Sequence, residues 1–136
     1  MIQKLSHATV WVLDQDRAKA FYTEKLGFEV KMDVSMGSFR WLTVSPPGQP
    51  DLEIVLMAIG ASQMMDAETA ATLRSLVEKG VMGAGAFETA DCRKTYEELK
   101  ARGVRFMGEP AERPYGIEAI LQDDSGNWFS MTEHPK

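Results

Sequence analysis

The sequence has one cysteine, two histidines and no long hydrophobic run. Cys92 cannot form a disulfide within the chain, which suits a reducing compartment, so we expect a cytoplasmic protein. No stretch approaches the about 20 apolar residues that a membrane-spanning helix needs. Residues 1–5 lack the basic and then apolar run of a secretory signal. We therefore expect no contact with a membrane.

An excess of basic residues is also missing. The chain has 15 lysines and arginines against 20 acidic residues, for a net charge of −5. Nucleic-acid binding needs a basic surface, so this balance argues against it. Hydrophobic residues make up 44% of the 136 positions, which is an ordinary composition for one globular domain. We expect a single domain whose partner is a small molecule.

One pattern of predicted elements occurs twice in the chain. In the first copy, β-branched and aromatic residues from His7 to Val12 predict a strand, Asp14 can cap a helix, and Gly27 can end that helix. The second copy has the same order, with a strand over 85–89 that precedes Asp91 and Gly103. The capping residue and the glycine are 13 positions apart in the first copy and 12 in the second. This near-equality indicates an internal duplication.

Three further strands follow the glycine of each copy. Turn residues such as Pro-Pro-Gly and Asp-Ser-Gly-Asn separate the last two strands of each copy. In the first copy these two strands are 39–44 and 52–57, with the turn over 45–50. In the second copy they are 116–122 and 128–132, with the turn over 123–127. The pattern predicts an α+β fold in which two βαβββ modules form a curved mixed sheet around a cleft. Module one would span about 2–57, a linking helix about 61–80, and module two about 81–133.

Several short motifs together resemble the vicinal oxygen chelate superfamily, which includes glyoxalase I, bleomycin-resistance proteins, fosfomycin-resistance enzymes and extradiol dioxygenases. The motifs are a strand that opens on His7, Asp14-x-x-x-Ala18-x-x-Phe21-Tyr22, Leu26-Gly27-Phe28, and Asp123-x-x-Gly126-Asn127 before the last strand. The resemblance covers residues 2–133. Each motif is modest alone, but their order and spacing are typical of bacterial glyoxalase-like proteins. The resemblance implies a homodimer.

The resemblance also implies a place for a divalent metal such as Zn, Ni, Mn or Fe. Each module of the superfamily can supply one ligand from its first strand and one from its last. The matching positions are His7 and Glu53 in module one, and Ala84 and Ser130 in module two. Catalytic zinc usually has three protein ligands, and non-haem iron uses two histidines and a carboxylate. A third ligand could come from Glu118, but the register of its strand decides where its side chain points.

Aromatic residues on the predicted strands are candidates for lining the cleft, because small-molecule pockets are mainly apolar with a few polar groups. Phe39 and Trp41 share one face of their strand, and Trp128 shares a face with Ser130. Tyr115 lies beside the same strands. Packing in the core is the alternative for most of these side chains.

Two classes of function remain open on the sequence. The first is a metal-dependent lyase or dioxygenase that uses His7 and Glu53, with Glu118 as a possible third ligand. The second is a metal-free, drug-binding resistance protein that holds an aromatic or cationic compound among Phe39, Trp41 and Trp128, with Glu53 and Glu118 supplying negative charge. The sequence favours a glyoxalase-like protein with an incomplete metal site.

Overall fold

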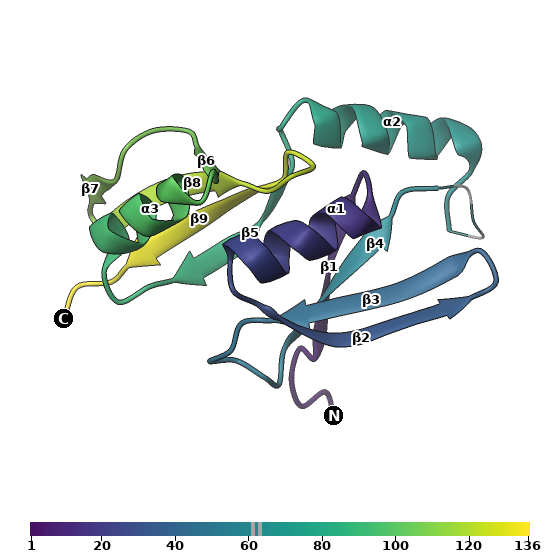
Figure 1. Cartoon of the computed structure of the whole chain (residues 1–136), viewed down its shortest axis with the longest axis horizontal. Helices are drawn as coiled ribbons and strands as arrows, with labels where there is room; N and C mark the ends of the chain where they lie inside the picture. Colours follow the sequence, from purple (N-terminus) through teal and green to yellow (C-terminus); the bar gives the residue numbers. More distant parts are fainter. Residues whose placement is uncertain (61, 63) are drawn as a thin grey trace.

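The computed structural model describes residues 1–60, 62 and 64–136, and it contains two modules in succession (Figure 1). Module one comprises β1 (His7–Val12), α1 (Gln15–Ala20), the π-helical turn η1 (Phe21–Lys25), β2 (Glu29–Met36), β3 (Phe39–Ser45) and β4 (Glu53–Ala58). Its strands form a mixed sheet in the order β1-β4-β3-β2, in which β1 and β4 are parallel.

Module two repeats this plan with one additional short strand. It comprises β5 (Gly83–Glu88), α3 (Cys92–Ala101), β6 (Arg105–Phe106), β7 (Ala111–Arg113), β8 (Gly116–Gln122) and β9 (Trp128–Glu133). The sheet order is β5-β9-β8-β6, β7 pairs with β8, and β5 and β9 are parallel. The predicted α+β class with two tandem βαβββ modules is confirmed. Each module has its own open sheet.

The ends of the helices follow from local chemistry. The side chains of Asp14 and Asp91 accept hydrogen bonds from the backbone N–H groups three residues later, at 2.9 and 3.1 Å. Each bond satisfies an N–H that the helix itself leaves free. Gly27 and Gly103 follow the helical segments with φ of 76° and 90°. These are left-handed conformations that favour glycine, so both predicted helix ends are confirmed.

The one-residue difference between the two copies is absorbed in the first helix. The N–H of Leu26 donates to the carbonyl of Phe21 at 3.2 Å, which is the five-residue step of a π-helix. The second helix ends without such a turn, at Ala101. A single π-helical turn can hold one extra residue without breaking the helix. It also leaves both Phe21 and Tyr22 buried.

The two modules share a hydrophobic core. Phe87 of β5 stacks on Phe129 of β9 with ring centroids 4.3 Å apart, and Phe28 of module one meets Phe87 edge-on at 5.5 Å. Tyr22 meets Phe129 edge-on at 6.3 Å. Offset and edge-on pairs such as these stabilise a core beyond the area that they bury. The core therefore spans both sequence halves.

The turn before β9 ties module two to module one. Asn127 Nδ2 donates to the carbonyl of Trp11 at 2.7 Å, and the N–H of Leu13 donates to Ser125 Oγ at 2.9 Å. The hydroxyl of Tyr22 donates to Asp123 Oδ2 at 2.7 Å. Burial, together with the adjacent Asp123 carboxylate, raises the pKa of this phenol well above its usual value. These bonds join residues more than 100 positions apart.

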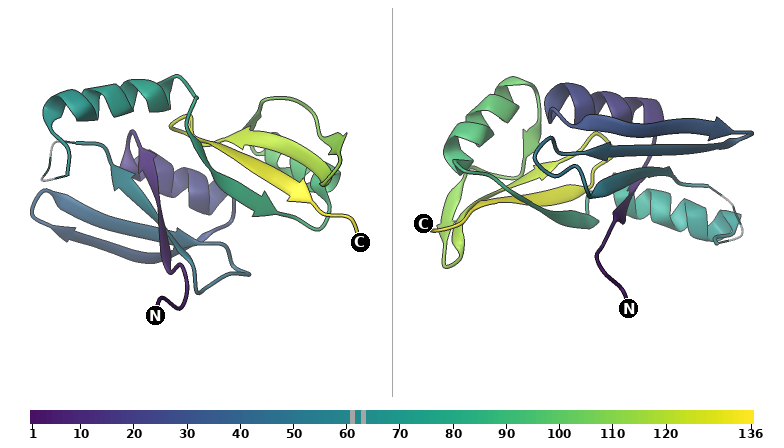
Figure 2. Two further views of the ribbon diagram at one scale, coloured as in Figure 1. Left: turned by 180° about the vertical axis from the view of Figure 1, so that it is seen from behind. Right: turned by 90° about the horizontal axis from the view of Figure 1, so that it is seen from below.

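The linking helix is α2 (Ala67–Glu78), which Asp66 caps by accepting from the N–H of Thr69. The predicted segment began at residue 61, which together with residue 63 lies outside the described residues. Ala70 and Val77 of α2 are buried with Ile59, and Trp11 packs against this group. Figure 2 shows α1 and α2 on opposite sides of the first sheet. Within the described part of the chain, no helix is both long and apolar enough to cross a membrane.

Candidate functional site

The first sheet has one buried face and one open face. Val10, Val12, Leu42 and Leu56 are buried in the shared core on the side of α1. Strand alternation and the cross-strand pairs place the remaining side chains on the opposite side. We call this the open face; it comprises His7, Thr9, Trp11, Met32, Val34, Met36, Phe39, Trp41, Thr43, Glu53, Val55 and Met57. Several of its large apolar side chains are exposed, including Met32, Val34, Met36 and Phe39.

His7 and Glu53 are direct cross-strand partners at one end of the open face. Their Nε2 and Oε2 atoms lie 3.4 Å apart, and the side chains are 40% and 24% exposed. Thr43 donates its hydroxyl hydrogen to Glu53 Oε1 at 2.7 Å, and Ser6 Oγ lies 3.0 Å from the other ring nitrogen of His7. These contacts orient both groups while leaving Glu53 Oε2 directed at the imidazole. The pair can exchange hydrogen bonds with a polar group of a ligand.

An aromatic row extends from this pair along the open face. The rings of His7 and Trp41 have centroids 6.0 Å apart, and those of Trp41 and Phe39 are 6.4 Å apart. The three rings are tilted relative to one another rather than stacked. The predicted common face of Phe39 and Trp41 is therefore present. It offers apolar, aromatic surface beside two ionisable groups.

The second sheet carries a separate polar cluster. Glu118 and Thr132 are cross-strand partners, and Ser130 donates its hydroxyl hydrogen to Glu118 Oε2. Tyr115 donates to Glu118 Oε1 at 2.7 Å, and Arg113 Nε lies 3.9 Å from the same oxygen. The hydrogen bonds from Ser130 and then Tyr115 lower the pKa of Glu118, so its carboxylate is ionised and already has donors. The Glu118 carboxylate is therefore better suited to accepting a hydrogen bond from a bound molecule than to abstracting a proton from it.

Two details of the second sheet differ from the sequence-based correspondence. Ser130 pairs with Ala86, whereas Ala84 lies in an irregularity of the β5–β9 register between Gly83 and Gly85. Trp128 lies against Gly83 so closely that a Cβ there would be 2.6 Å from its ring. Gly83 thus provides the space for this indole. Neither Ala84 nor Ala86 carries a donor atom that could bind a metal.

The donor set does not fit a catalytic metal centre. His7 and Glu53 are within reach of one ion, but a catalytic zinc site needs three protein ligands and an open position. In residues 1–60, 62 and 64–136, no three histidine, cysteine, aspartate or glutamate side chains come together as a metal site would require. Glu118 lies in the other sheet and does not join His7 and Glu53 within one chain. We therefore derive no chemical step through a metal.

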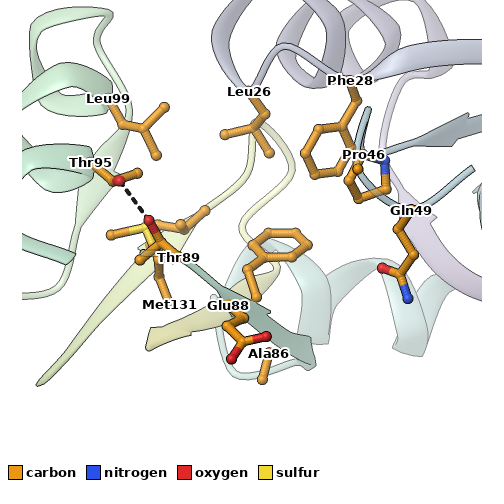
Figure 3. Close-up of a pocket in the computed structure, with 13 residues that line it drawn as sticks. Leu26, Phe28, Pro46, Gln49, Ala86, Glu88, Thr89, Thr95, Leu99 and Met131 are labelled. Atoms are coloured by element: carbon orange, nitrogen blue, oxygen red, sulfur yellow. Dashed lines mark hydrogen bonds between the residues drawn. The ribbon is translucent and has the colours of Figure 1, made fainter. Parts of the chain in front are cut away.

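A separate cavity lies between the modules, on the core side of the sheets (Figure 3). It has a volume of about 740 Å³ and includes Leu26 and Phe28 of module one and Thr89 and Thr95 of module two. The two threonine hydroxyls are 2.7 Å apart and satisfy each other. None of the cleft residues predicted from the sequence lines this cavity. Gln49 and Glu88 also line it. We place the candidate site on the open face because the aromatic row lies beside the His7–Glu53 pair there.

The structure adds residues that sequence reasoning did not single out. Thr43 lies two positions after Trp41 on β3, so strand alternation alone puts it on the same face. Met57 pairs with Trp11 across β1 and β4 and also lies on that face. The polar Thr43 between the apolar Leu42 and Val44 was the available signal. Cys92 is fully buried, and burial raises the pKa of its thiol, which disfavours the reactive thiolate form.

The chain belongs to the Glyoxalase/Bleomycin resistance protein/Dioxygenase superfamily, whose family model matches residues 4–131. It is 36% identical to the uncharacterized protein YurT of Bacillus subtilis (strain 168) over 131 residues, which are 96% of this chain and 98% of YurT. Among solved structures, UcmS2 is 53% identical, with a TM-score of 0.92 over 98% of this chain and 99% of that one. TnmS3, an antibiotic binding protein from Streptomyces sp. CB03234, is 28% identical, with a TM-score of 0.76 and coverage of 98% of each chain.

Proposed function

We propose that this protein binds an aromatic small molecule, such as an aromatic antibiotic, on the open face of its first sheet. We propose that no metal takes part in this binding. The observation that carries the proposal is the row of Trp41 and Phe39 rings next to the His7–Glu53 pair. Aromatic surface with a few placed polar groups is the usual composition of a ligand site. The similarity to TnmS3, an antibiotic binding protein, supports the same function.

We further propose that the protein acts as a homodimer. The open face exposes large apolar side chains such as Met32 and Met36, and a contiguous apolar surface of this kind often marks an interface. The polar cluster around Glu118 lies on the second sheet, away from His7 and Glu53. A second copy could bring its second sheet over the open face and so enclose the ligand.

The binding proposal is tested with 2-naphthol as a simple planar phenol. Isothermal titration calorimetry after dialysis against a chelator should show saturable binding with one site per chain. Trp41→Leu should weaken it by roughly tenfold, because it removes the stacking surface. Glu53→Gln should weaken it by a similar factor, since it removes the charged acceptor for the phenol O–H. Sedimentation velocity on the same samples should give twice the 15.2 kDa mass of one chain.

The control variant is Gln49→Trp, which narrows the inter-module cavity from an exposed loop. It should leave the affinity unchanged. Loss of binding in Gln49→Trp but not in Trp41→Leu would place the ligand in that cavity and refute the proposed site.

The metal-dependent enzyme is the second candidate, favoured by the direct pairing of His7 with Glu53. We expect protein purified without added metal to contain well under one equivalent of zinc, nickel, manganese or iron, because an ion with two protein ligands keeps mostly water around it. His7→Ala should change the free energy of unfolding by less than about 1 kcal/mol, as expected for a partly exposed pair. Elemental analysis and denaturant titration measure these quantities.

A metal that remains at one equivalent after dialysis, and is lost in His7→Ala, would contradict the metal-free proposal. Glu118→Ala would then show whether the second copy supplies the third ligand.

A further inference from the structure

The open face has a hollow at the end of the strands that lies away from His7. The hollow has a volume of about 520 Å³. Trp11, Phe39 and Met57 of the sheet line it, and the segment before α2 contributes Ser62 and Met64. Met64 is 91% exposed, so its side chain is accessible to an occupant of the hollow. We call this cavity the end hollow.

The distance from the His7–Glu53 pair to the end hollow follows from strand geometry. His7 and Trp11 are both on β1 and on the same face, four residues apart, so their Cα atoms are separated by about 13 Å. Trp41 lies between the two ends, with its ring 6.0 Å from His7 and 6.4 Å from Phe39. The surface from the pair to the hollow is therefore a continuous aromatic path.

The two ends of this path differ in polarity. At the first end, Glu53 has a carboxylate oxygen facing His7, with Thr43 alongside. At the hollow, the guanidinium of Arg40 is engaged by Asp16 at 2.6 Å and Asp33 at 2.8 Å on the other side of the sheet. Trp11, Phe39, Met57 and Met64 give the hollow a mainly apolar lining, beside Ser38 and Gln15, whose Nε2 donates to the carbonyls of Arg40 and Leu56. Thioether side chains adapt readily to flat apolar groups.

We propose that the site selects an elongated, planar aromatic ligand of about 13 Å, with a hydrogen-bonding group at the His7–Glu53 pair and an apolar end in the end hollow. This inference rests on the proposed function and adds the shape, polarity and orientation of the ligand. Phe39, Met57 and Met64 then determine specificity for length, while Glu53 anchors the polar end.

The test compares two phenols by isothermal titration calorimetry. 2-Naphthol reaches from the pair only to Trp41, whereas 4-hydroxystilbene is long enough to reach the end hollow. 4-Hydroxystilbene should bind at least roughly tenfold more tightly, because its second ring is buried in the hollow. Met64→Ala should weaken 4-hydroxystilbene by roughly three- to tenfold and leave 2-naphthol within about twofold, whereas Phe39→Ala should weaken 4-hydroxystilbene more than it weakens 2-naphthol. Glu53→Gln should weaken both.

Met64 and Phe39 are exposed, so neither substitution threatens folding, and thermal unfolding checks each variant. Met107→Ala, an exposed methionine of module two, is the matched control and should change neither affinity. Equal affinity of the two probes, together with insensitivity to Phe39→Ala and Met64→Ala, would overturn the length selection while leaving the proposed function intact. Failure of both probes to bind would overturn the proposed function itself, and the inference with it.

Discussion

Asp123→Ala is expected to lower the free energy of unfolding by about 3–5 kcal/mol, because it leaves several buried donors without an acceptor. The Asp123 side chain is 1% exposed. One oxygen accepts from the backbone N–H groups of Ser125, Gly126 and Asn127 at 2.9–3.0 Å. The other accepts from Tyr22 and from the Asn127 side chain at 2.7 and 3.1 Å. Alanine removes all five bonds and fills none of the positions.

Urea unfolding followed by tryptophan fluorescence measures this loss. Tyr22→Phe is the matched control, because it removes a single donor and should cost about 1 kcal/mol. The substitution should also weaken the contact between the modules, since the turn 123–127 is hydrogen-bonded to Trp11, Leu13 and Tyr22 of module one. A loss below about 1 kcal/mol would show that water replaces the carboxylate and that the turn does not depend on it.

Replacing the next residue should have the opposite effect: Asp124→Asn should stabilise the protein at pH 8. Both carboxylate oxygens of Asp124 are buried and have no hydrogen-bond partner among the described residues. Burial, and then the charge of Asp123, raise the pKa of Asp124 to about 6. Asparagine keeps the shape and removes the charge, so the gain above pH 7 should be about 1–2 kcal/mol after allowance for partial exposure.

The pH dependence identifies the cause. Between about pH 4 and pH 6, the folded state holds a proton on Asp124 that the unfolded chain has released. The stabilising effect of this proton is present at low pH and is lost as the pH rises through about 6. The difference in the free energy of unfolding between Asp124→Asn and the parent should therefore grow from near zero at pH 4 to its full value by pH 7.5. A difference that is constant with pH would assign the effect to packing.

The sequence alone determined the order of the elements and the duplication, because those depend on contacts within a few residues. Asp14, Asp66 and Asp91 cap helices through bonds to the third residue onward. Gly27 and Gly103 end the helical segments in a conformation that other residues rarely adopt. The alternation of strands also put Phe39 and Trp41 on one face. His7 and Glu53 could be paired from the family resemblance, and the structure places them side by side.

Only the tertiary structure decided where the strands stand relative to one another. A register shift at Ala84 pairs Ser130 with Ala86. A slip of one residue moves each side chain of a strand to the opposite face of the sheet. Glu118 lies on the second sheet, where its side chain accepts hydrogen bonds from Ser130 and Tyr115 and does not join His7. The end hollow likewise depends on where Ser62 and Met64 lie relative to the first sheet. Register and packing are set by contacts between distant residues, which no local pattern in the sequence specifies.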